Sequence, residues 1–122
     1  MAGFDVIRHA TYQEVVIEGN VTLPLLREVL DQIAKDDDWF SLNVLWLFGA
    51  DIRPPAFHEF DDIIAMVDKL YVRRPTGKRV ALVVLDSFTL SVATVFQGLA
   101  VRLPVQMRIF DDPEAARAWV EV

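Results

Sequence analysis

Apolar stretches alternate with amphipathic stretches along the chain, as expected of strands that alternate with helices. Residues 42–48 and 80–85 are apolar runs of strand length, and their continuity is typical of strands that are buried on both faces. Shorter apolar patterns at residues 4–9, 12–18 and 105–110 complete five predicted strands. A helix is predicted after every strand except the first.

The predicted helices are marked by apolar residues at helical spacing and by residues that favour a helix start. Thr22 and Asp112 are typical N-caps, and each is followed by a proline in the first turn. The four helices are predicted at residues 23–34, 57–71, 87–101 and 113–120. The order ββαβαβαβα predicts a single α/β domain over residues 1–122, with a mostly parallel five-stranded sheet covered by helices and one antiparallel N-terminal strand.

The helix predicted at residues 87–101 contains no charged residue, which is unusual for a helix on the surface of a small domain. Its larger apolar residues are predicted to face the sheet: Val92, Val95, Phe96, Leu99 and Leu103. Smaller residues are predicted on its outer side: Ser91, Ala93, Thr94, Gly98 and Val101. A small, uncharged surface permits close approach at a low desolvation cost, so we interpret it as a partner surface. The alternative is a helix half covered by its own neighbours.

The composition supports burial against a partner and argues against nucleic acid. Apolar residues make up 53% of the 122-residue chain, whereas the charged fraction of 25% is ordinary. The net charge of -6 disfavours a surface for binding DNA or RNA. The basic residues are scattered apart from one cluster, which leaves room for a local anion contact: Arg73, Arg74, Lys78 and Arg79.

The chain lacks the usual devices of catalysis and metal binding. It has no cysteine, no glycine-rich phosphate loop and no nucleophile elbow. His9 and His58 are each interpreted as isolated surface histidines. Residues 36–38 are three consecutive aspartates, which suit a solvated loop better than a cation site. We therefore predict a protein that is not an enzyme and has no cofactor or metal. We also expect it to be soluble and cytoplasmic, without a membrane span.

Polar residues follow two of the buried strands directly. Asp51 comes after the strand at 42–48, and Asp86 and Ser87 come after the strand at 80–85. Ligands of open α/β sheets tend to lie at the carboxyl ends of the strands, so these residues are candidates for a polar site. The simpler interpretation is that Asp86 or Ser87 caps the helix that follows.

Several short motifs carry a family resemblance. Leu45-Trp46, the Val-Ala-Leu-Val run at residues 80–83 and the closing segment at residues 108–120 resemble the bacterial SpoIIAA-like family. Such proteins are similar to STAS domains, the fold of anti-sigma-factor antagonists, and to Sec14-type lipid-binding domains. In STAS antagonists switched by kinases, a phosphorylatable Ser or Thr follows the third strand. Residues 49–56 of this chain contain no hydroxyl, so the resemblance does not extend to that switch; Asp51 could supply a fixed negative charge there.

Two functional hypotheses follow, with catalysis as a weak third. The first is a non-enzymatic STAS-like interaction or regulatory module, expected to be a homodimer that pairs through the uncharged helix. The second is a carrier or sensor of an apolar ligand such as a lipid. Its pocket would be lined by aromatic side chains that are otherwise ordinary core residues: Trp46, Phe57, Phe60 and Phe96. An enzyme using Asp51, Asp86 and His58 is the least supported reading.

Overall fold

The fold is a five-stranded sheet whose strands lie in the same order in space as in the sequence. The structure is a computed structural model, and it describes residues 3–72 and 77–122. The strands are β1 (Gly3–Arg8), β2 (Tyr12–Glu18), β3 (Asn43–Phe48), β4 (Lys78–Val83) and β5 (Val105–Phe110). β1 pairs antiparallel with β2, and the other three pairings are parallel. The predicted α/β class, element order and largely parallel sheet are therefore confirmed.

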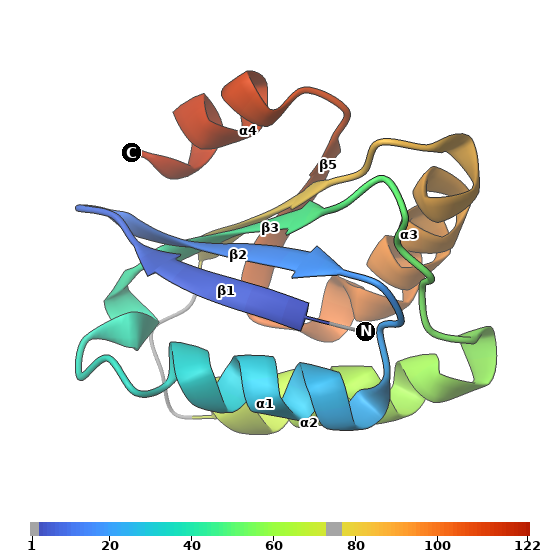
Figure 1. Ribbon diagram of the computed structural model, residues 1–122. Helices are drawn as coiled ribbons and strands as arrows, with labels where there is room; N and C mark the ends of the chain where they lie inside the picture. Colours follow the sequence, from blue (N-terminus) through green and yellow to red (C-terminus); the bar gives the residue numbers. More distant parts are fainter. Residues whose placement is uncertain (1–2, 73–76) are drawn as a thin grey trace.

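Three helices cover one face of the sheet and the last helix covers the other (Figure 1). They are α1 (Leu23–Ile33), α2 (Phe60–Tyr71), α3 (Ser87–Leu99) and α4 (Pro113–Val120). Parallel connections that are right-handed and all step in one direction place their helices on one face, which explains why α1, α2 and α3 lie together. Because the strand order never reverses, the described sheet has no topological switch point. The ligand crevice of doubly wound sheets therefore has no counterpart here.

Apolar packing follows the alternation of side chains along the strands. Val15 and Ile17 of β2, with Val44 of β3, pack against the three-helix side, and Phe60 of α2 completes this core. On the α4 side, Leu45, Ala81 and Val83 pack against Ala116 and Val120. The two layers make both faces of β3 and β4 apolar, as their continuous apolar runs predict.

The helix starts are fixed by side-chain caps at the predicted residues. The hydroxyl of Thr22 accepts a hydrogen bond from the amide of Leu25 at 3.2 Å. The carboxylate of Asp112 accepts one from the amide of Glu114 at 3.1 Å. These bonds satisfy amide groups that have no partner within the helix.

Two strands end earlier than the sequence predicts. β4 spans Lys78–Val83 rather than residues 80–85, so Leu85 has left the strand and is exposed. β1 ends at Arg8, which places His9 in the tight connection to β2 rather than in a strand. The apolar character of residues 80–85 continues beyond the last strand pair, so composition alone could not mark the end of β4.

Candidate functional site

The outer side of α3 is an exposed surface without charge. Phe88 at its first turn is 68% exposed, and Val101 just beyond its end is 81% exposed. We use the name "α3 outer face" for the exposed residues from Phe88 to Val101: Phe88, Leu90, Ser91, Thr94, Val95, Gly98, Leu99 and Val101. Large apolar side chains lie along both flanks of this face and small residues lie between them, since helical spacing places Ser91, Thr94 and Gly98 on the central line.

The hydroxyl groups on the α3 outer face are satisfied within the helix. The Ser91 hydroxyl donates to the carbonyl of Ser87 at 3.1 Å, and the Thr94 hydroxyl donates to the carbonyl of Leu90 at 2.8 Å. Such bonds to the preceding turn leave few free donors on the surface. The cost of removing water from this face is correspondingly low, because burying an unpaired polar group is the expensive part of desolvation.

Part of the predicted orientation of α3 is wrong. Val95 and Leu99, expected to face the sheet, are 45% and 49% exposed, whereas Ala93, expected outside, is buried. Ala93 packs over β4, and Ala100 packs beside Leu103. These small side chains let the helix lie close to the sheet. The sequence prediction assigned the larger residues to the interior, so its inward side was rotated from the true one, and the exposed Phe88 and Leu90 were missed.

A cavity of about 130 Å³ lies between the sheet and the helices of the three-helix side. Its lining is apolar and comes from β3, β4, β5 and all three helices on that face. Trp46 and Phe48 lie on the central strand yet are not fully buried. We attribute this accessibility to the cavity that lies against them, because the helices cover this face.

Three of the four aromatic residues predicted for an apolar pocket line this cavity. These are Trp46, Phe60 and Phe96, and the Phe60 and Phe96 rings meet edge to face at 5.3 Å between centroids. Phe57 does not line it and is 61% exposed. Phe57 begins a 3-10 turn (Phe57–Glu59) that precedes α2, so the helical spacing used to place it inside does not hold at that residue.

Two polar side chains reach the cavity lining. Thr89 is buried, and its hydroxyl donates to the Asp86 carboxylate at 2.8 Å. Tyr71 is buried at the end of α2, and its ring meets Trp39 edge to face at 5.3 Å. Burial raises the pKa of the Tyr71 hydroxyl to about 12, because the charged phenolate would lose its solvation. Both groups are therefore uncharged in neutral solution, which keeps the lining apolar.

Comparison with solved structures gives the fold. An uncharacterised protein of the DUF3478 family from Shewanella loihica PV-4, whose crystal structure at 2.25 Å resolution has a SpoIIAA-like fold, matches with a TM-score of 0.60. The match covers 98% of this chain and 93% of that chain at 17% sequence identity. This chain has a SpoIIAA-like fold. No protein-family model and no curated protein matches the sequence.

The SpoIIAA-like fold separates the polar residues at the strand ends into different roles. Asp86 is the N-cap of α3 and accepts a hydrogen bond from the amide of Thr89 at 2.8 Å. The two hydrogen bonds from Thr89 hold the pKa of the Asp86 carboxyl below its usual value. Ser87 is exposed in the first turn, and Asp51 is exposed in the loop after β3. No hydrogen bond or ion pair joins Asp51 to Asp86 or Ser87 in the part of the chain that the structure describes.

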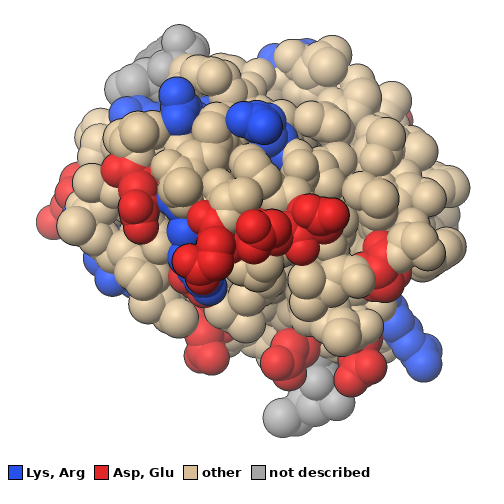
Figure 2. Space-filling view, turned by 90° about the horizontal axis from the view of Figure 1, so that it is seen from above, with Lys and Arg blue, Asp and Glu red and all other residues tan. Residues whose placement is uncertain are grey.

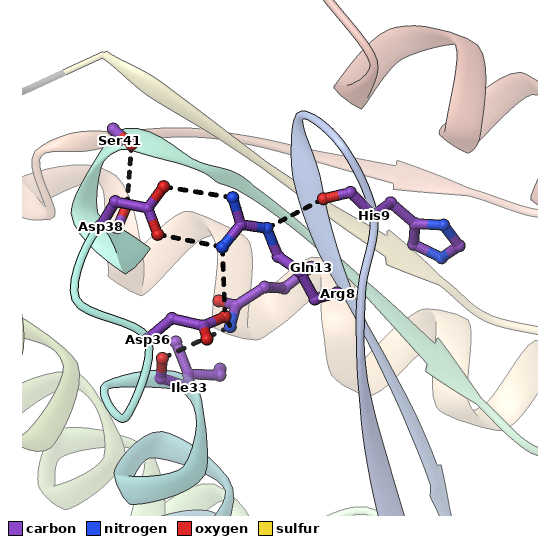
Figure 3. Close-up of polar contacts among 7 residues, drawn as sticks. All are labelled: Arg8, His9, Gln13, Ile33, Asp36, Asp38 and Ser41. Atoms are coloured by element: carbon purple, nitrogen blue, oxygen red, sulfur yellow. Dashed lines mark hydrogen bonds and ion pairs between the residues drawn. The ribbon is translucent and has the colours of Figure 1, made fainter.

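Two of the three consecutive aspartates, Asp36 and Asp38, hold an arginine of β1 (Figure 3). The Arg8 guanidinium donates to both oxygens of Asp38 at 2.9 and 3.1 Å and lies 3.5 Å from Asp36. This hydrogen bonding lowers the pKa of the Asp38 carboxyl. Among the described residues there is no group of three or more potential metal-ligating side chains of the His, Cys, Asp or Glu type.

One histidine is not isolated, contrary to expectation. The Nε2 atom of His9 lies 3.2 Å from a Glu14 oxygen, and its ring stacks on Tyr12 with centroids 4.4 Å apart. His58 is exposed in the turn before α2 and lies on a different element from Asp51 and Asp86. Within residues 3–72 and 77–122, no helix is long and apolar enough to cross a membrane.

Proposed function

We propose that the protein is a non-enzymatic STAS-like interaction module that pairs with a second copy of itself through the α3 outer face. The observation that carries this proposal is an exposed apolar helix surface without a charged residue between Ser87 and Val101. Exposed apolar surfaces of this kind mark interaction sites more often than scattered single residues do. In the view of Figure 2, charged side chains are sparse over the upper right of the surface, whereas acidic and basic side chains lie at the lower right.

Pairing with a second copy of the chain is favoured because an uncharged surface suits the contact at a two-fold symmetry axis. In a two-fold dimer the same surface patch meets itself, so any charge near the axis faces its own copy. The chain carries a net charge of -6, and most of its surfaces would repel each other on that account. The α3 outer face avoids this repulsion. Its central small residues also allow two helices to approach closely, with the flanking apolar side chains packed around them.

Gly98 allows a clean test of the dimer. Beyond the chain neighbours of Gly98 and the backbone of its own helix, a Cβ atom added at this residue would meet no heavy atom within 4 Å, so the monomer has open space for a side chain there. We expect the wild-type protein to sediment at twice the 13.9 kDa chain mass at high micromolar concentration. Gly98→Arg should weaken dimerisation by about a hundredfold or more, since like charges brought together in an interface cost several kcal/mol.

Two controls separate the interface from effects on folding. Gly98→Ala should leave the dimer intact and stabilise the helix by about 0.5–1 kcal/mol, because glycine is unfavourable inside a helix. Gln32→Arg adds the same charge on the exposed side of α1, and this variant should still sediment as a dimer. A monomer at all concentrations tested, or equal behaviour of Gly98→Arg and Gln32→Arg, would show that the α3 outer face is not a self-interface.

A second function, that of carrier or sensor of an apolar ligand, is favoured by the cavity. An empty cavity costs roughly 24 cal/mol per Å³, so about 130 Å³ corresponds to about 3 kcal/mol of lost stability. Apolar cavities of similar size remain dry and accept small apolar molecules. A ligand that fills the space would recover this energy, and Trp46, Phe60 and Phe96 would contact it directly.

Filling the cavity by mutation tests the carrier function. Val67 of α2 lines the cavity, so Val67→Phe should place its ring there and stabilise the protein by about 1 kcal/mol for each 50 Å³ filled. Benzene should raise the unfolding temperature of the wild-type protein and have no effect on Val67→Phe. Ala65→Phe on the exposed side of the same helix is the matched control and should respond like wild type. An equal rise in all three proteins would place benzene binding outside the cavity.

A further inference from the structure

Two arginine side chains from neighbouring strands lie against a single tryptophan ring on the α4 side of the sheet. The Cζ atom of Arg79 in β4 lies 5.2 Å from the ring centroid of Trp119 in α4. The Cζ atom of Arg108 in β5 lies 5.4 Å from the same ring and 5.0 Å from the ring of Phe110. The two rings are themselves in contact, with centroids 5.7 Å apart. The guanidinium groups of Arg79 and Arg108 are thus both within cation–π distance of the Trp119 ring.

Neither of these arginines has a carboxylate partner among the described residues. Arg8 and Arg117, by contrast, form ion pairs with acidic side chains. Arg79 donates one side-chain hydrogen bond, to the carbonyl of Trp119 at 2.8 Å, and the side chain of Arg108 donates none to a described residue. A guanidinium group carries five N–H donors, so most donors of this pair remain available.

The register of the sheet brings the two charges to one face. Arg79 is opposite Gln106, and Arg108 is opposite Ala81, so the two arginines are diagonal neighbours on adjacent strands. Like charges at such a spacing repel each other, and the aromatic contacts offset only part of that cost. Lys and Arg side chains gather along the upper edge of the face shown in Figure 2, apart from most of the acidic ones. A local positive site therefore exists on a protein of net charge -6.

We propose that Arg79 and Arg108 bind an oxyanion, the phosphate or carboxylate group of a small molecule, with Trp119 holding both guanidinium groups in place. Arginine suits this ligand because its planar fork donates two parallel hydrogen bonds to a carboxylate or phosphate. Contact with the rings restricts the side chains before binding, so less conformational entropy is lost when the anion is bound. An anion between the two guanidinium groups also removes their repulsion. This site is independent of the α3 outer face and of the cavity.

NMR titration tests this site with sodium phosphate and sodium acetate as separate probes, each at constant ionic strength balanced with sodium chloride. The indole N–H of Trp119, assigned with Trp119→Phe, should shift and reach saturation. In Arg108→Gln the apparent affinity should fall at least tenfold. Arg108 is exposed and forms no hydrogen bond within the described chain, so this variant should fold normally. Arg102→Gln, which removes an exposed arginine after α3, should titrate like wild type.

The two probes identify the anion. Saturation with phosphate alone assigns a phosphate group, saturation with acetate alone assigns a carboxylate, and saturation with both assigns a general oxyanion site. Shifts that rise linearly without saturation for both probes, or that are the same in Arg108→Gln as in wild type, would overturn the proposal. Arg79→Gln gives a second check, because it should weaken binding at least tenfold while Trp119 and Arg108 remain present.

Discussion

Replacement of Phe60 by alanine should lower the free energy of unfolding by about 3–5 kcal/mol, the range for removal of a buried aromatic ring. Phe60 is 1% exposed, and its ring meets Phe57 and Phe96 edge to face at 5.4 and 5.3 Å. Because its side chain already borders the cavity, its loss enlarges an existing space that the surrounding residues have not closed. Urea denaturation followed by tryptophan fluorescence measures the change.

Phe57 provides the matched control for this prediction. The same chemical change at Phe57 removes a ring that is mostly exposed and touches Phe60 from outside. We expect Phe57→Ala to cost less than about 1 kcal/mol, since it loses one aromatic contact and little burial. A cost at Phe57 equal to that at Phe60 would mean that the core extends over the turn before α2. A small cost at Phe60 would mean that the surrounding residues close around the space left by the ring.

The contrast between these two residues illustrates what the sequence could predict of the fold. Strand runs and N-caps are local signals, so the five strands and the starts of α1 and α4 were predictable from composition and capping chemistry. Helical spacing placed Phe60 correctly inside. It placed Phe57 inside as well, because the spacing cannot show that the chain forms a 3-10 turn before α2 begins.

The candidate site was less predictable because it depends on which elements lie beside α3. The lack of charge over residues 87–101 singled out this helix, and Ser91, Thr94, Gly98 and Val101 do lie on its exposed side. The inward side could not be assigned from side-chain size, since Ala93 and Ala100 pack inside while Leu99 lies outside. The cavity depends on the spacing of three helices over one sheet, which no local pattern contains. Arg79 belongs to the basic cluster that the sequence analysis identified, but its neighbours Arg108 and Trp119 are close to it only in the folded chain. The other arginines of that cluster, Arg73 and Arg74, lie outside the described residues.

Replacement of Arg117 by alanine is the second change expected to have a large effect, because it leaves a buried carboxylate without its cation. Glu14 is buried on β2, and its carboxylate lies 3.5 Å from the Arg117 guanidinium of α4. Removing one partner of a buried charged pair costs more than the pair contributes, since the remaining charge stays desolvated. Because Arg117 itself is partly exposed, we expect a loss of about 2–3 kcal/mol, somewhat below the roughly 3–5 kcal/mol typical of fully buried pairs.

Glu114→Ala is the control for this prediction, because Glu114 binds the same arginine from the solvent side. Its carboxylate lies 2.7 Å from Arg117, but its side chain is 81% exposed, and exposed ion pairs contribute about 1 kcal/mol or less. Both variants remove one charge from α4, so the difference between their losses of unfolding free energy reports the contribution of the buried Glu14. Equal losses in urea denaturation would show that Arg117 acts through α4 itself and not through Glu14.

A second substitution, at the buried partner, gives an independent check. A double variant, Arg117→Ala with Glu14→Gln, should recover most of the loss at pH 7, because no charge then remains buried between the sheet and α4. Urea denaturation of the wild type, the single variant and the double variant measures this recovery. A loss that Glu14→Gln does not recover would show that it comes from packing rather than from the buried charge.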